Sequence, residues 1–123
     1  MVTVPSFLLR RLYVRGSLRN TNPGMQFQLL NKLGAGYARK LFPLVVDGQD
    51  VPMDRCTFST NGTEVPFDTV SNETPFTLDL NKTTTINVAE MVLTDKPHTI
   101  GMSFEVPGLG VLQFDFTDVP SSG

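Results

Sequence analysis

The sequence predicts an all-β protein: an antiparallel β-sandwich, of jelly-roll or immunoglobulin-like type, with about eight or nine short strands. Apolar and polar residues alternate in most segments, as expected where one face of a strand is buried and the other meets water. Turn-forming residues interrupt these segments at intervals of about ten residues. We expect a single domain over 1–123, with a core over 8–118 and frayed ends.

The clearest pattern is a hairpin near the start of the chain. In its first strand one face carries Leu12, Val14, Gly16 and Leu18, and the other carries Arg11, Tyr13, Arg15, Ser17 and Arg19. In its second strand Met25, Phe27 and Leu29 alternate with Gln26 and Gln28. The residues between them, 20–24, favour a tight reversal because asparagine and glycine accept turn geometry and proline presets its own φ.

Two further turns have a strong hairpin signature. Asp47-Gly48 and Asn61-Gly62 suit a type I′ turn, which requires positive φ at both central residues. The first should join a strand over 41–46, interrupted by Pro43, to a return over 49–53. The second should join 55–60 to 63–67.

The alternation continues through the second half of the chain. We expect a polar loop over 68–77 and then strands over 83–90, 99–106 and 109–118. In the last two strands the inward residues should be Ile100, Met102, Phe104, Val106, Leu112, Phe114 and Phe116.

Composition excludes several classes of function. The 123 residues have a formal net charge of −2, so the chain as a whole does not attract nucleic-acid phosphates. No apolar run approaches the roughly 18 residues that a membrane helix needs. The first residues lack a basic segment followed by a long apolar run, so no signal peptide is indicated. We therefore expect a cytoplasmic protein that binds neither nucleic acid nor membrane.

The residues that usually carry chemistry are few and scattered. Cys56 is the one cysteine, and its strand-like flanks predict a buried structural thiol. His98 is the one histidine, and it follows a turn, which predicts a surface or strand-entry residue. We expect this chain to bind no metal or cofactor and to hold no catalytic residue.

Two groups of residues are candidates for contact with a partner. Arg11, Arg15 and Arg19 would share one strand face, which is either a solvated face that discourages aggregation or a subunit contact. The glycine-hinged loop 34–43 holds Tyr37, Arg39 and Phe42, whose residue types are enriched at interface centres. The alternative for this loop is that Phe42 tucks into the core.

Several segments resemble the small β subunit of C-glycoside deglycosidases. The resemblance rests on 13–21 (YVRGSLRNT), 24–27 (GMQF), 31–33 (NKL), 45–52 (VVDGQDVP) and 110–116 (GVLQFDF). It implies a β-sandwich subunit that packs on a TIM-barrel α subunit within an αβ hetero-oligomer. The α subunit of that family holds a divalent metal, commonly manganese, whereas the β subunit supplies no catalytic residue.

The resemblance also implies a reaction for the complex. Its substrates are C-glycosides, such as flavonoid C-glycosides, whose sugar C3 hydroxyl has become a ketone, and the carbon–carbon bond to the aglycone is cleaved by elimination. The complex would be a lyase and this chain alone noncatalytic. The alternative is a stand-alone carbohydrate-binding or protein-interaction module, against which the absence of tryptophan weighs.

Overall fold

The computed structural model of the chain describes residues 4–21, 24–60 and 62–121. Within these ranges most ordered segments are short antiparallel strands, which confirms the all-β prediction. There are twelve strands in these ranges instead of eight or nine. The expected strand over 41–46 is divided into two, and the segments 36–38 and 76–78, which were expected to lie in loops, also form strands. The finer assignment to a jelly-roll or immunoglobulin-like sandwich stays a prediction, as does the single domain.

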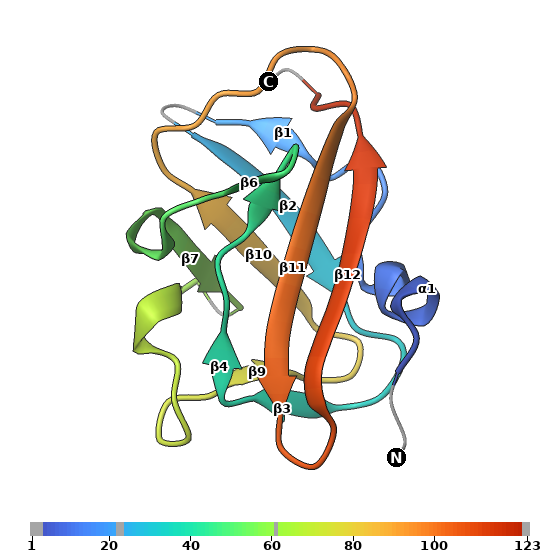
Figure 1. Cartoon of the computed structure of the whole chain (residues 1–123), viewed down its shortest axis with the longest axis vertical. Coiled ribbons are helices and arrows are strands. Elements are labelled where there is room, and N and C mark those ends of the chain that lie inside the picture. The colour runs from blue at the N-terminus through green and yellow to red at the C-terminus, as the bar shows by residue number, and fades with distance from the viewer. Residues whose placement is uncertain (1–3, 22–23, 61, 122–123) are drawn as a thin grey trace.

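Two five-stranded sheets and a two-stranded ribbon make up the fold (Figure 1). The first sheet contains, in spatial order, β1 (Arg19–Asn20), β2 (Met25–Leu30), β10 (Thr83–Val88), β7 (Cys56–Ser59) and β8 (Glu64–Pro66). The second contains β12 (Gly110–Asp118), β11 (His98–Val106), β5 (Val45–Val46) and β6 (Gln49–Asp50), and β4 (Lys40–Leu41) also pairs with β11. The ribbon joins β3 (Gly36–Ala38) to β9 (Phe76–Leu78).

The core lies between the two sheets. In Figure 1 the long β11–β12 hairpin crosses in front of β2 and β10. Phe27 of β2 reaches Phe116 of β12 with ring centroids 5.1 Å apart, and Phe76 of β9 links Phe58 of β7 to Phe104 of β11. Burial of these rings is the main favourable term that holds the layers together, since each removes a large apolar area from water.

The expected hairpins at Asp47-Gly48 and in the second half of the chain are confirmed. Asp47 has φ 51° and Gly48 φ 87°, as a type I′ turn requires, and Val46 pairs with Gln49 across it. Pro43 separates β4 from β5, and both strands pair with β11. The inward residues of β11 and β12 are buried as predicted, except that Val106 is only partly buried.

The other two hairpin turns lie partly outside the described residues. Residues 22–23 and 61 are not described, but the strands beside them pair as expected: Asn20 with Met25, and Ser59 with Glu64. The polar loop expected over 68–77 holds more structure than predicted, because Phe76–Leu78 forms β9, which pairs with β3 and buries Phe76 and Leu78.

The N-terminal strand prediction is wrong. The chain forms a helical turn, α1 (Ser6–Leu9), and a 3₁₀ turn, η1 (Arg10–Leu12), and regular pairing with β2 begins only at Arg19. Two more 3₁₀ turns are present, η2 (Met53–Arg55) and η3 (Phe67–Thr69). Leu9 and Leu12 are three residues apart and both buried, so a helical turn places them on one face. A period of two could not reveal this helical spacing.

None of the helices in the described part of the chain has the length and apolar character needed to cross a membrane. Cytoplasmic location stays a prediction.

A substitution at Gly24 tests the close approach of the chain just before β2 to the backbone of β10. A Cβ atom at Gly24 would lie 1.8 Å from the carbonyl oxygen of Val88, a backbone atom of β10. Gly24→Ala should therefore lower the free energy of unfolding by about 2 kcal/mol or more, measured by urea denaturation. Gly36→Ala is the matched control, since its added Cβ would meet nothing within 4 Å. Equal destabilisation by both substitutions would contradict this packing.

Candidate functional site

A cleft beside the N-terminal helical turns gathers three arginines. Its volume is about 520 Å³. We call it the arginine cleft, and it is lined by Phe7, Arg10, Arg11, Tyr13, Arg15, Phe116, Thr117 and Asp118. The first five come from α1, η1 and the bend that follows, and the last three from the end of β12. The cleft therefore joins two parts of the chain that are about a hundred residues apart.

Arg10 is anchored to the free edge of β12. Its Nε donates a hydrogen bond of 2.6 Å to the backbone carbonyl of Asp115, and its Nη2 lies 3.2 Å from Asp115 Oδ1. A guanidinium has five N–H donors, so these contacts leave others available to a ligand. Both side chains are about half exposed, so the ion pair orients Arg10 more than it stabilises the fold.

Asp118 holds the bend that carries Arg15. Its Oδ2 accepts hydrogen bonds from Tyr13 Oη at 2.7 Å and from the backbone N–H of Gly16 at 2.9 Å. Its Oδ1 accepts from the backbone N–H of Val119 at 2.8 Å. Gly16 has φ 84°, a conformation that favours glycine, so the chain can turn sharply toward the carboxylate here.

Tyr13 lines the cleft and packs against the core. Its ring stacks on Phe116 with centroids 3.6 Å apart and planes 8° from parallel, and its hydroxyl accepts from the backbone N–H of Leu18 at 3.2 Å. The expectation that Tyr13 shares a solvated strand face with the arginines is therefore wrong. Its ring is partly buried against the core while its hydroxyl meets Asp118, which suits the amphipathic character of tyrosine.

These contacts shift the pKa values of Tyr13 and Asp118 in opposite directions. Burial, followed by the hydrogen bond to Asp118, raises the pKa of Tyr13 to about 12. Burial alone would raise the pKa of Asp118, but the hydrogen bonds from Tyr13, Gly16 and Val119 outweigh it and hold that pKa below its usual value. The ionised carboxylate and the neutral phenol are thus the forms that the cleft stabilises.

The structure separates the three arginines that were expected on one strand face. Arg11 lies on η1, Arg15 lies in the bend after it, and Arg19 lies on β1 and does not line the cleft. Arg10, which was not among the candidate residues, is the third arginine that lines the cleft. The helical turn decides this, because it points Leu9 and Leu12 inward and leaves Arg10 and Arg11 outside.

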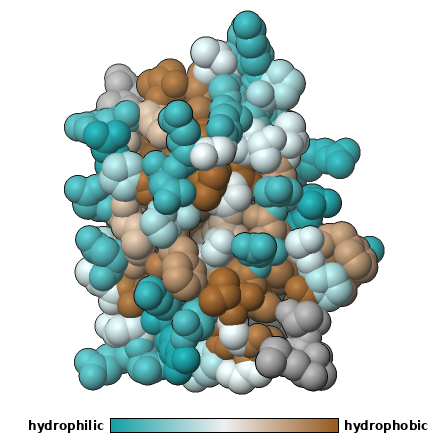
Figure 2. Space-filling model, viewed as in Figure 1, coloured by the Kyte–Doolittle hydropathy of each residue, from teal (hydrophilic) through white to brown (hydrophobic). Residues whose placement is uncertain are grey.

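An apolar groove of about 270 Å³ lies on the other side of α1 and η1. It is lined by Val4, Leu9, Leu12, Asn31, Leu33, Gly34, Ala35, Gly36, Tyr37, Ala38, Phe76, Leu78, Phe104, Val106, Leu109 and Leu112. Figure 2 shows hydrophobic side chains gathered in the lower half of the face on which β11 and β12 lie. The groove thus opens near the end of the molecule formed by the β3–β9 ribbon.

Asn31 shapes the rim of the apolar groove. It is 2% exposed, and its Nδ2 donates to the carbonyls of Gly34 and Leu78 at 2.8 Å each. Its Oδ1 accepts from the backbone N–H of Leu33 at 3.0 Å. The buried amide therefore satisfies the backbone of the glycine loop and holds Leu33 at the groove, with an exposed fraction of 42%.

The three candidates from loop 34–43 do not converge. Tyr37 is 46% exposed at the rim of the apolar groove. Arg39 pairs with Glu105 on β11 instead. Phe42 is partly buried, and the Nζ of Lys40 lies 5.1 Å from its ring centroid. Of this group only Tyr37 lines the groove.

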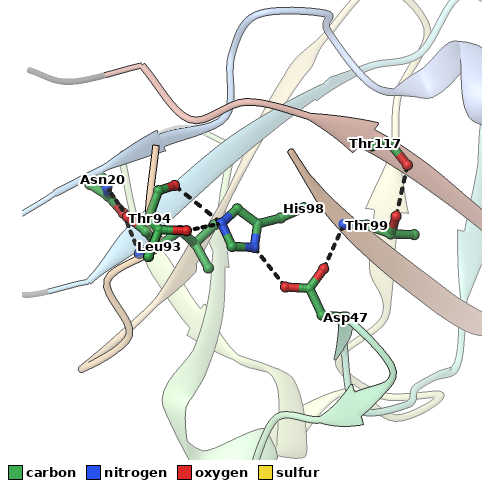
Figure 3. Close-up of polar contacts among 7 residues, drawn as sticks. All are labelled: Asn20, Asp47, Leu93, Thr94, His98, Thr99 and Thr117. Carbon is green, nitrogen blue, oxygen red and sulfur yellow. Dashed lines mark hydrogen bonds and ion pairs between the residues drawn. The ribbon is translucent and has the colours of Figure 1, made fainter. Parts of the chain in front are cut away.

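His98 begins β11, as the strand-entry interpretation predicts, and lies in a polar network that sequence reasoning missed (Figure 3). Its Nδ1 is 2.6 Å from Asp47 Oδ2, and its Nε2 is 3.0 Å from Thr94 Oγ1 and 3.1 Å from the Thr94 carbonyl. The hydrogen bond with His98 is the main cause that lowers the pKa of Asp47. The other Asp47 oxygen accepts from the backbone N–H of Thr99.

The His98 network ties loops together. It joins the β5–β6 turn to the loop before β11, and Asn20 holds the same loop through two 2.8 Å hydrogen bonds to the backbone of Leu93. An aspartate, a histidine and a hydroxyl in a row resemble a nucleophile with its base. However, Nε2 lies within reach of both the hydroxyl and the carbonyl of Thr94, and these contacts join two loops, so the geometry fits a clamp better than a general base.

Two candidates for chemistry remain, the thiol of Cys56 and a possible metal site. Cys56 is fully buried, as predicted, and burial raises the pKa of its thiol to about 11. Across 4–21, 24–60 and 62–121, no three His, Cys, Asp or Glu side chains form a group that could hold a metal ion. That the chain binds no cofactor stays a prediction.

The model of one protein family, the hydroxymethylglutaryl-CoA reductase N-terminal domain, matches residues 8–121. The match covers both sides of the arginine cleft and nearly the whole chain, so the chain belongs to this family. No curated protein matches the sequence.

This membership corrects the resemblance to C-glycoside deglycosidases. The chain is not the β subunit of a C–C lyase for 3-oxo-C-glycosides, and a TIM-barrel α subunit is not its partner. The family does not favour a stand-alone carbohydrate-binding or protein-interaction module either. The segments that carried the resemblance are turns and alternating strand residues, which unrelated β proteins share because the same backbone geometry requires them.

Replacing Tyr13 should change how stability responds to alkaline pH. The folded-state pKa is about 12 against an ordinary value of 10.0, so between these values the folded chain keeps a proton that the unfolded chain has lost. This contribution is complete below pH 10 and disappears as pH rises to 12. In urea denaturation across that interval, Tyr13→Phe should lose less stability than the unmodified chain.

The matched control is Tyr37→Phe, which alters an exposed tyrosine and should follow the unmodified chain. If Tyr13→Phe and Tyr37→Phe show the same alkaline dependence, the burial and hydrogen bonding of Tyr13 do not affect its titration.

Proposed function

We propose that this chain is a noncatalytic domain of a hydroxymethylglutaryl-CoA reductase and that it packs on the catalytic part of that enzyme through the apolar groove. Family membership supports the link to the enzyme. The groove supports the contact, because its lining is almost wholly apolar and the aromatic ring of Tyr37 stands exposed at its rim. That exposed apolar rim is the observation that carries the proposal.

The rim has the composition of an interface centre. Tyr37 and Leu33 are exposed to 46% and 42%, and both border the groove. Tyrosine gives a large contact area for little loss of side-chain entropy, and a groove beside it can receive an apolar anchor from a partner. The Arg39–Glu105 pair lies next to the ribbon and would form part of a polar rim.

The three candidates from loop 34–43 have different roles in this proposal. Tyr37 would lie at the centre of the contact. Arg39 would lie at its edge, where its pairing with Glu105 limits its contribution to affinity. Phe42 is covered in part by Lys40 and would act by supporting the loop.

The proposal predicts that a charge at the rim weakens the complex. Tyr37→Glu should raise the Kd for the catalytic part of the reductase at least about tenfold, because the partner would have to bury a carboxylate without a counter-ion. Surface plasmon resonance measures the Kd, and circular dichroism checks that the variant folds.

Val92→Glu is the matched control. Val92 is 69% exposed and lies in the loop between β10 and β11, outside the groove lining. The Val92→Glu variant should leave the Kd for the catalytic part of the reductase unchanged. Equal affinity for Tyr37→Glu and the unmodified chain would exclude the groove as the contact.

A further inference from the structure

We infer that the arginine cleft binds an extended acidic segment of a partner protein, which pairs with the free edge of β12 and places its carboxylates against Arg11 and Arg15. Three arginines and one aspartate line the cleft, so its formal charge is +2. The whole chain has a formal net charge of −2, so this attraction to anions is local. No described residue lines both the cleft and the apolar groove, so this contact is independent of the one proposed above.

Arg11 and Arg15 supply the donors for the incoming carboxylates. Both side chains are exposed, and neither makes a side-chain hydrogen bond or ion pair to another residue in the described ranges. A planar guanidinium matches a carboxylate with two parallel N–H donors. Each of these arginines can therefore take a carboxylate without breaking a contact within the chain.

The carboxylates that the chain itself places near these arginines already have partners. Asp118 accepts hydrogen bonds through both of its oxygens, from one side chain and two backbone N–H groups. Asp115 pairs with Arg10. An incoming acidic side chain therefore does not have to displace either carboxylate to reach the other two arginines.

The cleft lies against the free edge of β12. In the described part of the chain this strand ends its sheet, so β11 is its neighbour on one side and no strand lies on the other. Thr99 of β11 directs its carbonyl away from β12, where it accepts from the N–H of Asp47 at 2.8 Å. Thr117 is paired with Thr99 and therefore directs its own N–H and carbonyl outward, since such antiparallel pairs share no backbone hydrogen bond.

Arg10 shows that this edge accepts polar partners. Asp115 has the same orientation as Thr117, and its outward carbonyl accepts the 2.6 Å hydrogen bond from Arg10 Nε. The backbone N–H and carbonyl of Thr117 have no hydrogen-bond partner in the described ranges. Thr117 is exposed and lines the cleft, so an extended segment can pair with it there as an added strand.

Phe7 adds an apolar contact to the cleft. It lines the cleft and is 62% exposed. The side chains of an extended segment alternate between two faces, so acidic residues can meet the arginines while apolar residues between them cover Phe7. A small anion would use the arginines but neither the strand edge nor this ring, which favours a peptide as the occupant.

Fluorescence anisotropy of the 123-residue chain with labelled hexapeptides tests the inference. The probe peptide alternates glutamate and valine, and both of its ends are blocked. It should bind, whereas a peptide that alternates glutamine and valine should bind at least about tenfold more weakly because it lacks charge. A peptide that alternates lysine and valine should not bind, and higher salt should weaken binding of the glutamate probe.

N-methylation of the glutamate probe tests the strand pairing. In an extended peptide the N–H groups of the glutamates point to one edge and those of the valines to the other. Methylating one of these two sets should weaken binding at least about tenfold, whereas methylating the other set should leave it nearly unchanged. Equal effects of the two methylated peptides would contradict pairing with β12.

Variants of the chain locate the site. Arg11→Ala and Arg15→Ala should each weaken binding of the glutamate probe about tenfold, and Phe7→Ala should weaken it several-fold. Arg19→Ala is the matched control, because it removes an arginine of β1 that does not line the cleft, and it should have no effect. Circular dichroism checks that each variant folds.

Three further results would overturn the inference. Equal affinity for the glutamate and glutamine peptides would show that charge is not recognised, and equal losses from Arg19→Ala and Arg11→Ala would place the site elsewhere. Dimers of the chain that the probe dissociates, seen by analytical ultracentrifugation, would assign the cleft to a second copy of this chain. Tyr37→Glu should bind the probe normally, so failure of the groove contact is distinguishable from failure of this site.

Discussion

The packing of Phe116 is the interaction on which the rest of the structure depends. On one side its ring meets Phe27 of the first sheet at 5.1 Å, and on another it stacks on Tyr13 at 3.6 Å. The first contact joins the two sheets, and the second fixes the N-terminal segment against β12. Truncating a buried aromatic ring of this kind costs about 3–5 kcal/mol, a large share of the stability of a small domain.

The N-terminal helical turns give the molecule two unlike surfaces. Leu9 and Leu12 point toward the apolar groove, while Arg10 and Arg11 face the arginine cleft. A helical turn divides the residues in this way because positions three apart, such as Leu9 and Leu12, share a face, and the two residues between them lie on the other side. This short local structure thus separates the apolar groove from the arginine cleft.

Much of the fold was predictable because the strands have one buried face. The alternating apolar residues of β2, β10, β11 and β12 are buried as their period of two indicates, and Asp47-Gly48 adopts the expected positive φ values. The N-terminal segment was not predictable in the same way. Its residues satisfy a period of two over 11–19, but Leu9 and Leu12 pack through a helical turn, since tertiary packing outweighs a short local pattern.

Only some residues of the candidate sites could be predicted from the sequence. Arg11, Arg15 and Tyr37 do line the cleft or the groove, whereas Arg19, Arg39 and Phe42 lie elsewhere or have partners within the chain. The resemblance to a deglycosidase subunit was wrong because it rested on segments that describe a β backbone and no chemistry. The His98 network could not be foreseen, since Asp47 and His98 are 51 residues apart and meet only through sheet pairing.

By itself the sequence determined the all-β class, the principal hairpins and the inward residues of the long strands. These features depend on local periodicity and on turn residues whose backbone preferences act over a few positions. The tertiary structure alone decided which side chains meet: Tyr13 with Asp118, Arg10 with Asp115, and Asn31 with Leu78. Such pairs join residues far apart in the chain, and only the packing of the two sheets brings them within hydrogen-bond distance.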